Sequence, residues 1–148
     1  MTITCSKSYI DFPFAHRQPV HKGHCRFIHG HDWSFHFTFE ASELDECGFV
    51  VDFGKLKWIK ELLEFMFDHT TVLNEDDPHL DHIEADSNGA GRNLYDLRKV
   101  PDCSCEGLAL YTFNLVNQHL AEKEGNRVWV KSLTLFEDSK NSATVSAV

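Results

Sequence analysis

The chain has 148 residues and a formal net charge of −9 at pH 7. Such an acidic composition argues against a nucleic-acid binder, because phosphate contacts need clustered Lys and Arg side chains. No stretch has the length of a membrane span or the apolar run of a signal peptide, and the five cysteines are not spaced like a disulfide framework. We therefore expect one domain, residues 1–148, in the reducing cytoplasm.

Two strands are predicted in the first part of the chain. Residues 3–14 form the first, where Pro13 implies an edge position or a bulge. After a polar connection, residues 29–40 alternate strictly with a period of two. One face of this second strand carries two histidines followed by four aromatic residues: His29, His31, Trp33, Phe35, Phe37 and Phe39. The two histidines therefore continue the core-directed face.

Two helices and two more strands are predicted after that. Asp52 is placed to cap a helix over residues 55–67, and Ser104 a helix over residues 105–121. The apolar faces of these helices are Leu56, Ile59, Leu63 and Met66 in the first, and Leu108, Tyr111, Leu115 and Leu120 in the second. The long polar segment 75–101 reads as a loop. With strands at 128–137 and 143–148, the pattern predicts an α+β layer with both helices on one face of an antiparallel sheet.

Three histidines form a candidate metal site. Same-face neighbours on a strand are about 6.6 to 6.8 Å apart at the backbone, so the rings of His29 and His31 can turn toward one ion. Gly30 between them allows close approach from the other side. His16 continues the alternation of the first strand, which runs through Ile10, Phe12 and Phe14. If the two strands pair antiparallel, His16 becomes a third ligand, and three imidazoles with an open fourth position suit a catalytic Zn²⁺.

Cys25 and the Asp68-His69 pair are candidates for proton transfer. Cys25 is either a small apolar filler or a thiol whose polar, partly cationic neighbours favour the thiolate. His69, at the end of the first predicted helix, is either a favourable contact with the helix dipole or a proton shuttle oriented by Asp68.

Two further groups are candidates for binding a ligand or a second metal ion. Glu137, at the end of an apolar strand, is either simply solvent-exposed or grips a ligand that offers two adjacent N–H donors. His79 and His82 with Cys103 and Cys105 are a conceivable second, structural metal site, although their spacing matches no familiar pattern.

The motifs together resemble the 6-pyruvoyltetrahydropterin synthase and 6-carboxytetrahydropterin synthase family. The resemblance is carried by Phe14-Ala15-His16-Arg17, Cys25 with His29-Gly30-His31, Gly48-Phe49-Val50-Val51-Asp52-Phe53 with Leu56-Lys57, Asp68-His69 with Leu73-Asn74, and Glu137. It implies the tunnelling fold (T-fold), a four-stranded antiparallel sheet with two helices whose subunits join into a barrel and commonly stack as a hexamer.

The same resemblance implies roles for the site residues. His16, His29 and His31 are then the zinc ligands, and Cys25 is the catalytic thiol. Asp68 and His69 complete a proton relay from across a subunit interface, and Glu137 anchors the pterin ring.

Three residues separate Cys25 from His29-Gly30-His31, as in the bacterial 6-carboxytetrahydropterin synthases of queuosine and 7-deazaguanine biosynthesis. Those enzymes convert 7,8-dihydroneopterin triphosphate and release acetaldehyde and triphosphate. The chain departs from the family at Asp32-Trp33, which replaces Asn-Tyr, and at Cys103-Ser104-Cys105-Glu106, which replaces Pro-Thr-(Ser or Ala)-Glu. The alternatives are a pyruvoyl-forming or other pterin side-chain lyase, and a catalytically silent zinc- or pterin-binding protein.

Overall fold

The computed structural model describes residues 1–87, 89 and 92–148. Within these residues the strands form one six-stranded sheet of order β4-β3-β1-β2-β5-β6. The strands are β1 (Thr4–His16), β2 (His29–Ala41), β3 (Thr71–Asn74), β4 (Leu97–Val100), β5 (Val128–Phe136) and β6 (Ser142–Ser146). The helices are α1 (Lys57–Phe67), α2 (Leu80–Glu84) and α3 (Cys105–Glu124), with 3₁₀ turns at His24–Arg26 and Phe53–Lys55.

Four of these strands make the antiparallel sheet that the sequence predicts. β1 pairs with β2, β2 with β5, and β5 with β6, all antiparallel. β3 and β4 were not expected and extend the sheet beyond β1 as parallel neighbours. The prediction of a plain loop over residues 75–101 was therefore wrong in part, because that segment contains α2 and β4. Strands of four residues are too short for a period-two pattern to stand out from a polar background.

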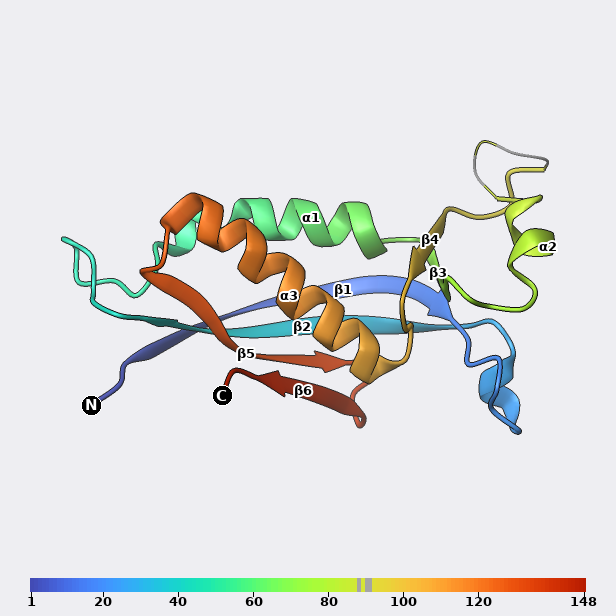
Figure 1. Ribbon diagram of the computed structural model, residues 1–148, viewed down its shortest axis with the longest axis horizontal. Coiled ribbons are helices and arrows are strands. Elements are labelled where there is room, and N and C mark those ends of the chain that lie inside the picture. The colour runs from blue at the N-terminus through green and yellow to red at the C-terminus, as the bar shows by residue number, and fades with distance from the viewer. Residues whose placement is uncertain (88, 90–91) are drawn as a thin grey trace.

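α1 and α3 cover one face of the long strands, as predicted (Figure 1). Ile59, Leu63 and Phe67 are the buried residues of α1, whereas Met66 is only half-buried. The inner face of α3 consists of Cys105, Leu108, Ala109, Thr112, Val116 and Leu120. The predicted face of the first helix is confirmed, since Leu56 is also buried and Met66 packs against the core. The predicted face of α3 was wrong in part, because the small side chains of Ala109 and Thr112 allow closer contact with the sheet than Tyr111 and Leu115 would.

The caps of the helices also follow the prediction in part. The Ser104 hydroxyl accepts a hydrogen bond from the Gly107 amide at the start of α3. The Asp52 carboxylate accepts from the Gly54 amide and so caps the 3₁₀ turn that precedes α1 rather than α1 itself.

A β-bulge in β1 decides which of its side chains face the core. The register with β2 shifts between Tyr9 and Phe12, and Asp11 has a φ of 68°. One extra residue in a strand reverses the alternation on its two sides. Tyr9 is therefore buried and Ile10, expected on the core face, is 60% exposed, while Phe12 and Phe14 remain inside as predicted.

The core lies between the sheet and the two long helices. Trp33, Phe35, Phe37 and Phe39 of β2 are all fully buried, which confirms the predicted face. Phe14 and Trp33 stack with their ring centroids 4.4 Å apart, and the Trp33 indole N–H donates to the Phe14 carbonyl oxygen at 3.1 Å. This contact fixes β1 against β2 next to the histidines. Among the described residues no helix is long and apolar enough to span a membrane.

Candidate metal centre

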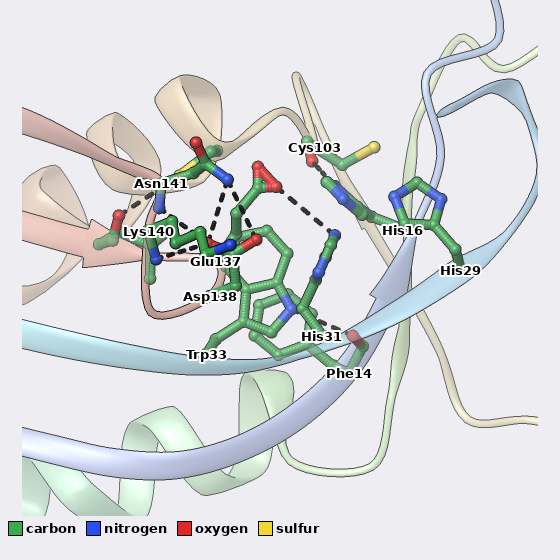
Figure 2. A network of polar contacts seen from close by, with 12 residues as sticks. Phe14, His16, His29, His31, Trp33, Cys103, Glu137, Asp138, Lys140 and Asn141 are labelled. Carbon is green, nitrogen blue, oxygen red and sulfur yellow. Dashed lines mark hydrogen bonds and ion pairs between the residues drawn. The ribbon is translucent and has the colours of Figure 1, made fainter. Parts of the chain in front are cut away.

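The pairing of β1 with β2 brings His16, His29 and His31 together. His16 is the Cα partner of His29, and Phe14 is the partner of His31. The ring centroids are 4.7 Å apart for His16 and His29, 5.4 Å for His16 and His31, and 5.0 Å for His29 and His31. One nitrogen of each ring lies within 4.8 Å of those of the other two. Figure 2 shows the three rings converging at the end of the sheet.

Backbone carbonyls fix the orientation and tautomer of two of these rings. His16 Nδ1 lies 2.7 Å from the Cys103 carbonyl oxygen, and His29 Nδ1 lies 2.7 Å from the Phe27 carbonyl oxygen. A carbonyl oxygen only accepts, so each Nδ1 carries the proton and donates it. The lone pair of each neutral ring is then on Nε2, which is the usual arrangement behind a metal-ligating histidine.

The site holds buried nitrogen atoms that make no hydrogen bond. Within the described part of the chain, His16 Nε2 and His31 Nε2 are buried without a hydrogen bond. Such groups are unfavourable unless something satisfies them. Burial, together with repulsion from His29 and His31, lowers the pKa of His16 to about 4 and outweighs the hydrogen bond to Cys103. His16 is therefore neutral near pH 7, and the donor set fits a Zn²⁺ ion.

An apolar wall supports the cluster from the core side. The Trp33 ring lies edge-on to His16 and His31, with centroids 4.9 Å and 5.5 Å away.

Gly30 is exposed, and a Cβ there would meet only the Phe14 carbonyl oxygen at an ordinary 3.8 Å. The protein itself therefore does not require glycine at this position.

Glu137 lies at the rim of the three-histidine cluster. Its Oε2 is 3.5 Å from His31 Nε2, and its side chain is 24% exposed (Figure 2). The turn that follows is held by the Asp138 carboxylate, which accepts from the amides of Lys140 and Asn141. The Glu137 amide donates to the Asn141 carbonyl oxygen across this turn. A carboxylate is thus held beside the three histidines without belonging to their cluster.

Cys25 lies in the 3₁₀ turn His24–Arg26, on the connection that leads into β2. The side chain is partly buried, and the Cys25 carbonyl accepts from the Gln18 amide at 2.8 Å. The Arg26 guanidinium donates to the Gly23 carbonyl and covers the Phe27 ring at 4.2 Å. The Arg26 charge is therefore directed to the Gly23 carbonyl and the Phe27 ring.

Asp68 and His69 form a pair, but they are not part of the cluster. His69 Nδ1 is 2.8 Å from Asp68 Oδ1, and the imidazole is 80% exposed. His69 has a φ of 59°, and its amide donates to the Pro13 carbonyl at 2.8 Å. The predicted acid–imidazole contact is present, and in the single chain it faces outward.

The second metal site is not supported. The Cys103 thiol donates to the Arg17 carbonyl, and the Cys105 thiol donates to the Leu135 carbonyl. Burial raises the pKa of both thiols, that of Cys105 to about 12. Over the described ranges, the three-histidine cluster is the only group of three or more His, Cys, Asp or Glu residues whose ligand atoms converge.

Sequence reasoning missed a buried ion pair behind His16. The Arg17 guanidinium donates to both carboxylate oxygens of Asp77 at 2.8 Å, and the Asp77 side chain is fully buried. The hydrogen bonds from Arg17 lower the pKa of Asp77. The only local signal was the arginine that directly follows His16, since Asp77 lies 60 positions further along a segment expected to be a loop.

Comparisons with known proteins identify the family of this chain. A family model described as 6-pyruvoyl tetrahydropterin synthase matches residues 4–147. The chain is 34% identical over 137 residues to the 6-carboxy-5,6,7,8-tetrahydropterin synthase of Rickettsia typhi, covering 91% of this chain and 94% of the relative. The corresponding protein of Rickettsia bellii is 32% identical over 141 residues, with the same coverage.

Two solved structures show the same fold. An uncharacterized protein of Wolinella succinogenes superposes with a TM-score of 0.84 at 21% identity, covering 100% of this chain and 99% of the other. The 6-pyruvoyltetrahydropterin synthase of Plasmodium vivax, as a catalytic-residue mutant, superposes with a TM-score of 0.68 at 19% identity, covering 98% of both chains.

Proposed function

Because the chain belongs to the 6-pyruvoyl tetrahydropterin synthase family, we propose that it is a zinc-dependent 6-carboxy-5,6,7,8-tetrahydropterin synthase. The reaction converts 7,8-dihydroneopterin triphosphate to 6-carboxytetrahydropterin, acetaldehyde and triphosphate, and would supply queuosine or another 7-deazaguanine product. The names of the Rickettsia relatives, which this chain matches over 91% of its length, support this branch of the family.

One observation carries the proposal. One imidazole nitrogen from each of the three histidines lies within 4.8 Å of the other two, and His16 Nε2 and His31 Nε2 are buried without a hydrogen-bond partner in the described structure. His16, His29 and His31 would hold Zn²⁺, with a fourth position left for substrate. The ion would supply Lewis-acid polarisation and acidification of the side-chain hydroxyls of the substrate.

The remaining residues would bind the substrate and move protons. Glu137 would accept hydrogen bonds from two adjacent N–H groups of the pterin ring, because its carboxylate lies at the rim of the cluster. The Cys25 thiolate and His69, oriented by Asp68, would transfer protons as triphosphate leaves and a carbon–carbon bond breaks.

The outward position of His69 favours a site shared between subunits. Its imidazole is 80% exposed in the single chain, so it is available to the active site of a neighbouring copy. We propose a cytoplasmic homo-oligomer, a hexamer by family resemblance, in which Asp68 and His69 of one subunit complete the site of the next.

Metal analysis and product identification on the purified protein test the function. We expect bound zinc, and acetaldehyde together with triphosphate from 7,8-dihydroneopterin triphosphate. Triphosphate without acetaldehyde would favour the alternative, a 6-pyruvoyltetrahydropterin synthase or a related pterin side-chain lyase. A zinc-loaded preparation that leaves the substrate unchanged would instead indicate a silent zinc- or pterin-binding protein.

A further inference from the structure

Three residues from two distant segments close around the end of β1, directly behind His16. They are Asn74, the last residue of β3, Asp77, which follows that strand, and Cys103, which precedes α3. We call these three residues the β1 clamp. The Asp77 amide donates to the Asn74 carbonyl at 3.0 Å, so the two residues are joined by the turn at the end of β3.

Asp77 holds the residue that follows His16. Its two carboxylate oxygens accept from Nε and Nη2 of Arg17, each at 2.8 Å. Asp77 Oδ1 also accepts from the His79 amide at 2.9 Å, so the carboxylate is itself fixed in place. The Asp77 side chain is fully buried, and a bidentate Arg–carboxylate pair fixes direction as well as distance.

Cys103 holds His16 itself, and Asn74 holds Cys103. The Cys103 carbonyl accepts from His16 Nδ1 at 2.7 Å, and the thiol donates to the Arg17 carbonyl at 3.1 Å. Asn74 Oδ1 accepts from the Cys103 amide at 2.8 Å. Asn74 therefore fixes, through its amide, the residue whose carbonyl orients the His16 ring. Figure 2 shows the Cys103 carbonyl beside the His16 ring.

We infer that Asn74 and Asp77 are positioning residues for the metal ligand His16, setting its tautomer and the direction of its Nε2 through Cys103 and Arg17. The inference rests on the metal site of the proposed function. It also assigns a role to Asp77 near the start of segment 75–101, which contacts the residue that follows β1. Partners behind a metal ligand typically change metal affinity by about 10- to 100-fold when they are removed.

The main test is the zinc affinity of Asp77→Asn, measured by chelator competition on the full-length protein. Asparagine keeps the shape and one acceptor but loses the charge and the bidentate pair. We expect the Kd for zinc to rise by about 10- to 100-fold. Asp86→Asn is the matched control, because Asp86 makes a similar bidentate pair with Arg92 in the same segment but on the surface. Its Kd should equal that of the wild type.

A second readout separates positioning from a general loss of stability. The tautomer of His16 in the metal-free protein can be read from ¹⁵N NMR of the imidazole nitrogens at one neutral pH. We expect the Nδ1–H form in the wild type and in Asp86→Asn, and a mixture of tautomers in Asp77→Asn. A destabilised but folded protein with unaltered positioning would keep the single tautomer.

A pair of variants at Asn74 tests the positioning role even if Asp77→Asn fails to fold. Asn74→Ala removes the acceptor for the Cys103 amide, whereas Asn74→Asp keeps it. Zinc affinity should fall in the first and recover in the second. Zinc affinity and His16 tautomer unchanged in Asn74→Ala, or unchanged in a folded Asp77→Asn, would overturn the inference. Absence of zinc binding by the wild type would refute the proposed metal site instead, while the tautomer measurement would still report on the clamp.

Discussion

His16 and His29 stand directly opposite each other on neighbouring antiparallel strands, with ring centroids 4.7 Å apart. Each donates its Nδ1 proton to a backbone carbonyl 2.7 Å away, one to Cys103 and the other to Phe27. Because these hydrogen bonds already restrain both rings, little further side-chain freedom would be lost if their Nε2 atoms bound an ion. His31, two residues along β2, supplies the third nitrogen.

The first prediction concerns the metal ligands. His31→Ala should lose both zinc and turnover, because two imidazoles do not hold a catalytic ion as three do. Metal content per chain is measured after gel filtration. His36→Ala is the control, since His36 lies on the opposite face of β2, where it contacts Ser8 and Ser34. Equal zinc content in His31→Ala and the wild type would contradict the three-histidine site.

Replacing Cys25 should lower the turnover rate without removing zinc. The Cys25→Ala variant is expected to keep its zinc, because the thiol is not one of the converging ligands. Its kcat should fall by about 10² to 10⁴-fold, the usual effect of removing a proton-transfer group. The measurement is zinc content alongside steady-state formation of triphosphate. Loss of zinc in this variant would instead make Cys25 a ligand.

Glu137 should affect substrate binding more than metal binding. Glu137→Gln keeps the volume but loses the charge, and charge-assisted hydrogen bonds are worth about 1.5 to 3 kcal/mol. We therefore expect kcat/KM for the pterin substrate to fall by about 10- to 100-fold with zinc content unchanged. A parallel loss of zinc would show that Glu137 acts on the metal centre through His31, which is 3.5 Å away.

Mixing two inactive variants tests whether the site is shared. In a Cys25→Ala and His69→Ala mixture, unfolded and refolded together, some sites combine the intact Cys25 of one subunit with the intact His69 of its neighbour. Random assembly of equal amounts should restore about one quarter of the sites. If both residues served the same subunit, no intact site would form and activity would stay at the level of the separate variants.

The stability of the metal-free protein should depend on pH through His16. Its pKa is about 4 in the folded state, below the ordinary value of 6.5, so between these values the unfolded chain binds more protons. The free energy of unfolding should therefore fall as the pH is lowered from 6.5 toward 4, by at most about 3 kcal/mol from this residue. Urea unfolding at several pH values measures it. His16→Asn, which does not titrate but keeps a donor for Cys103, should lack this contribution.

Several features of the fold and site could be predicted because they depend on local pattern. The alternation along residues 29–40 predicts the strand, its buried aromatic face and the direction of His29 and His31, since successive side chains of any strand point to opposite faces. The Ser104 cap and the two long helices follow from equally local rules. The pairing of Asp68 with His69 required only that they be neighbours.

Other features were decided by contacts between residues far apart in the chain. Nothing near Asp77 indicates that it lies buried against Arg17, and nothing near Cys103 indicates that its carbonyl orients His16, 87 positions away. The bulge at Asp11 reversed the alternation of β1 and exposed Ile10, although the position of His16 was as expected. A sequence pattern reports which face a side chain takes along its own element. Which partner it meets depends on how the elements pack, and the β1 clamp behind the three histidines arises from that packing.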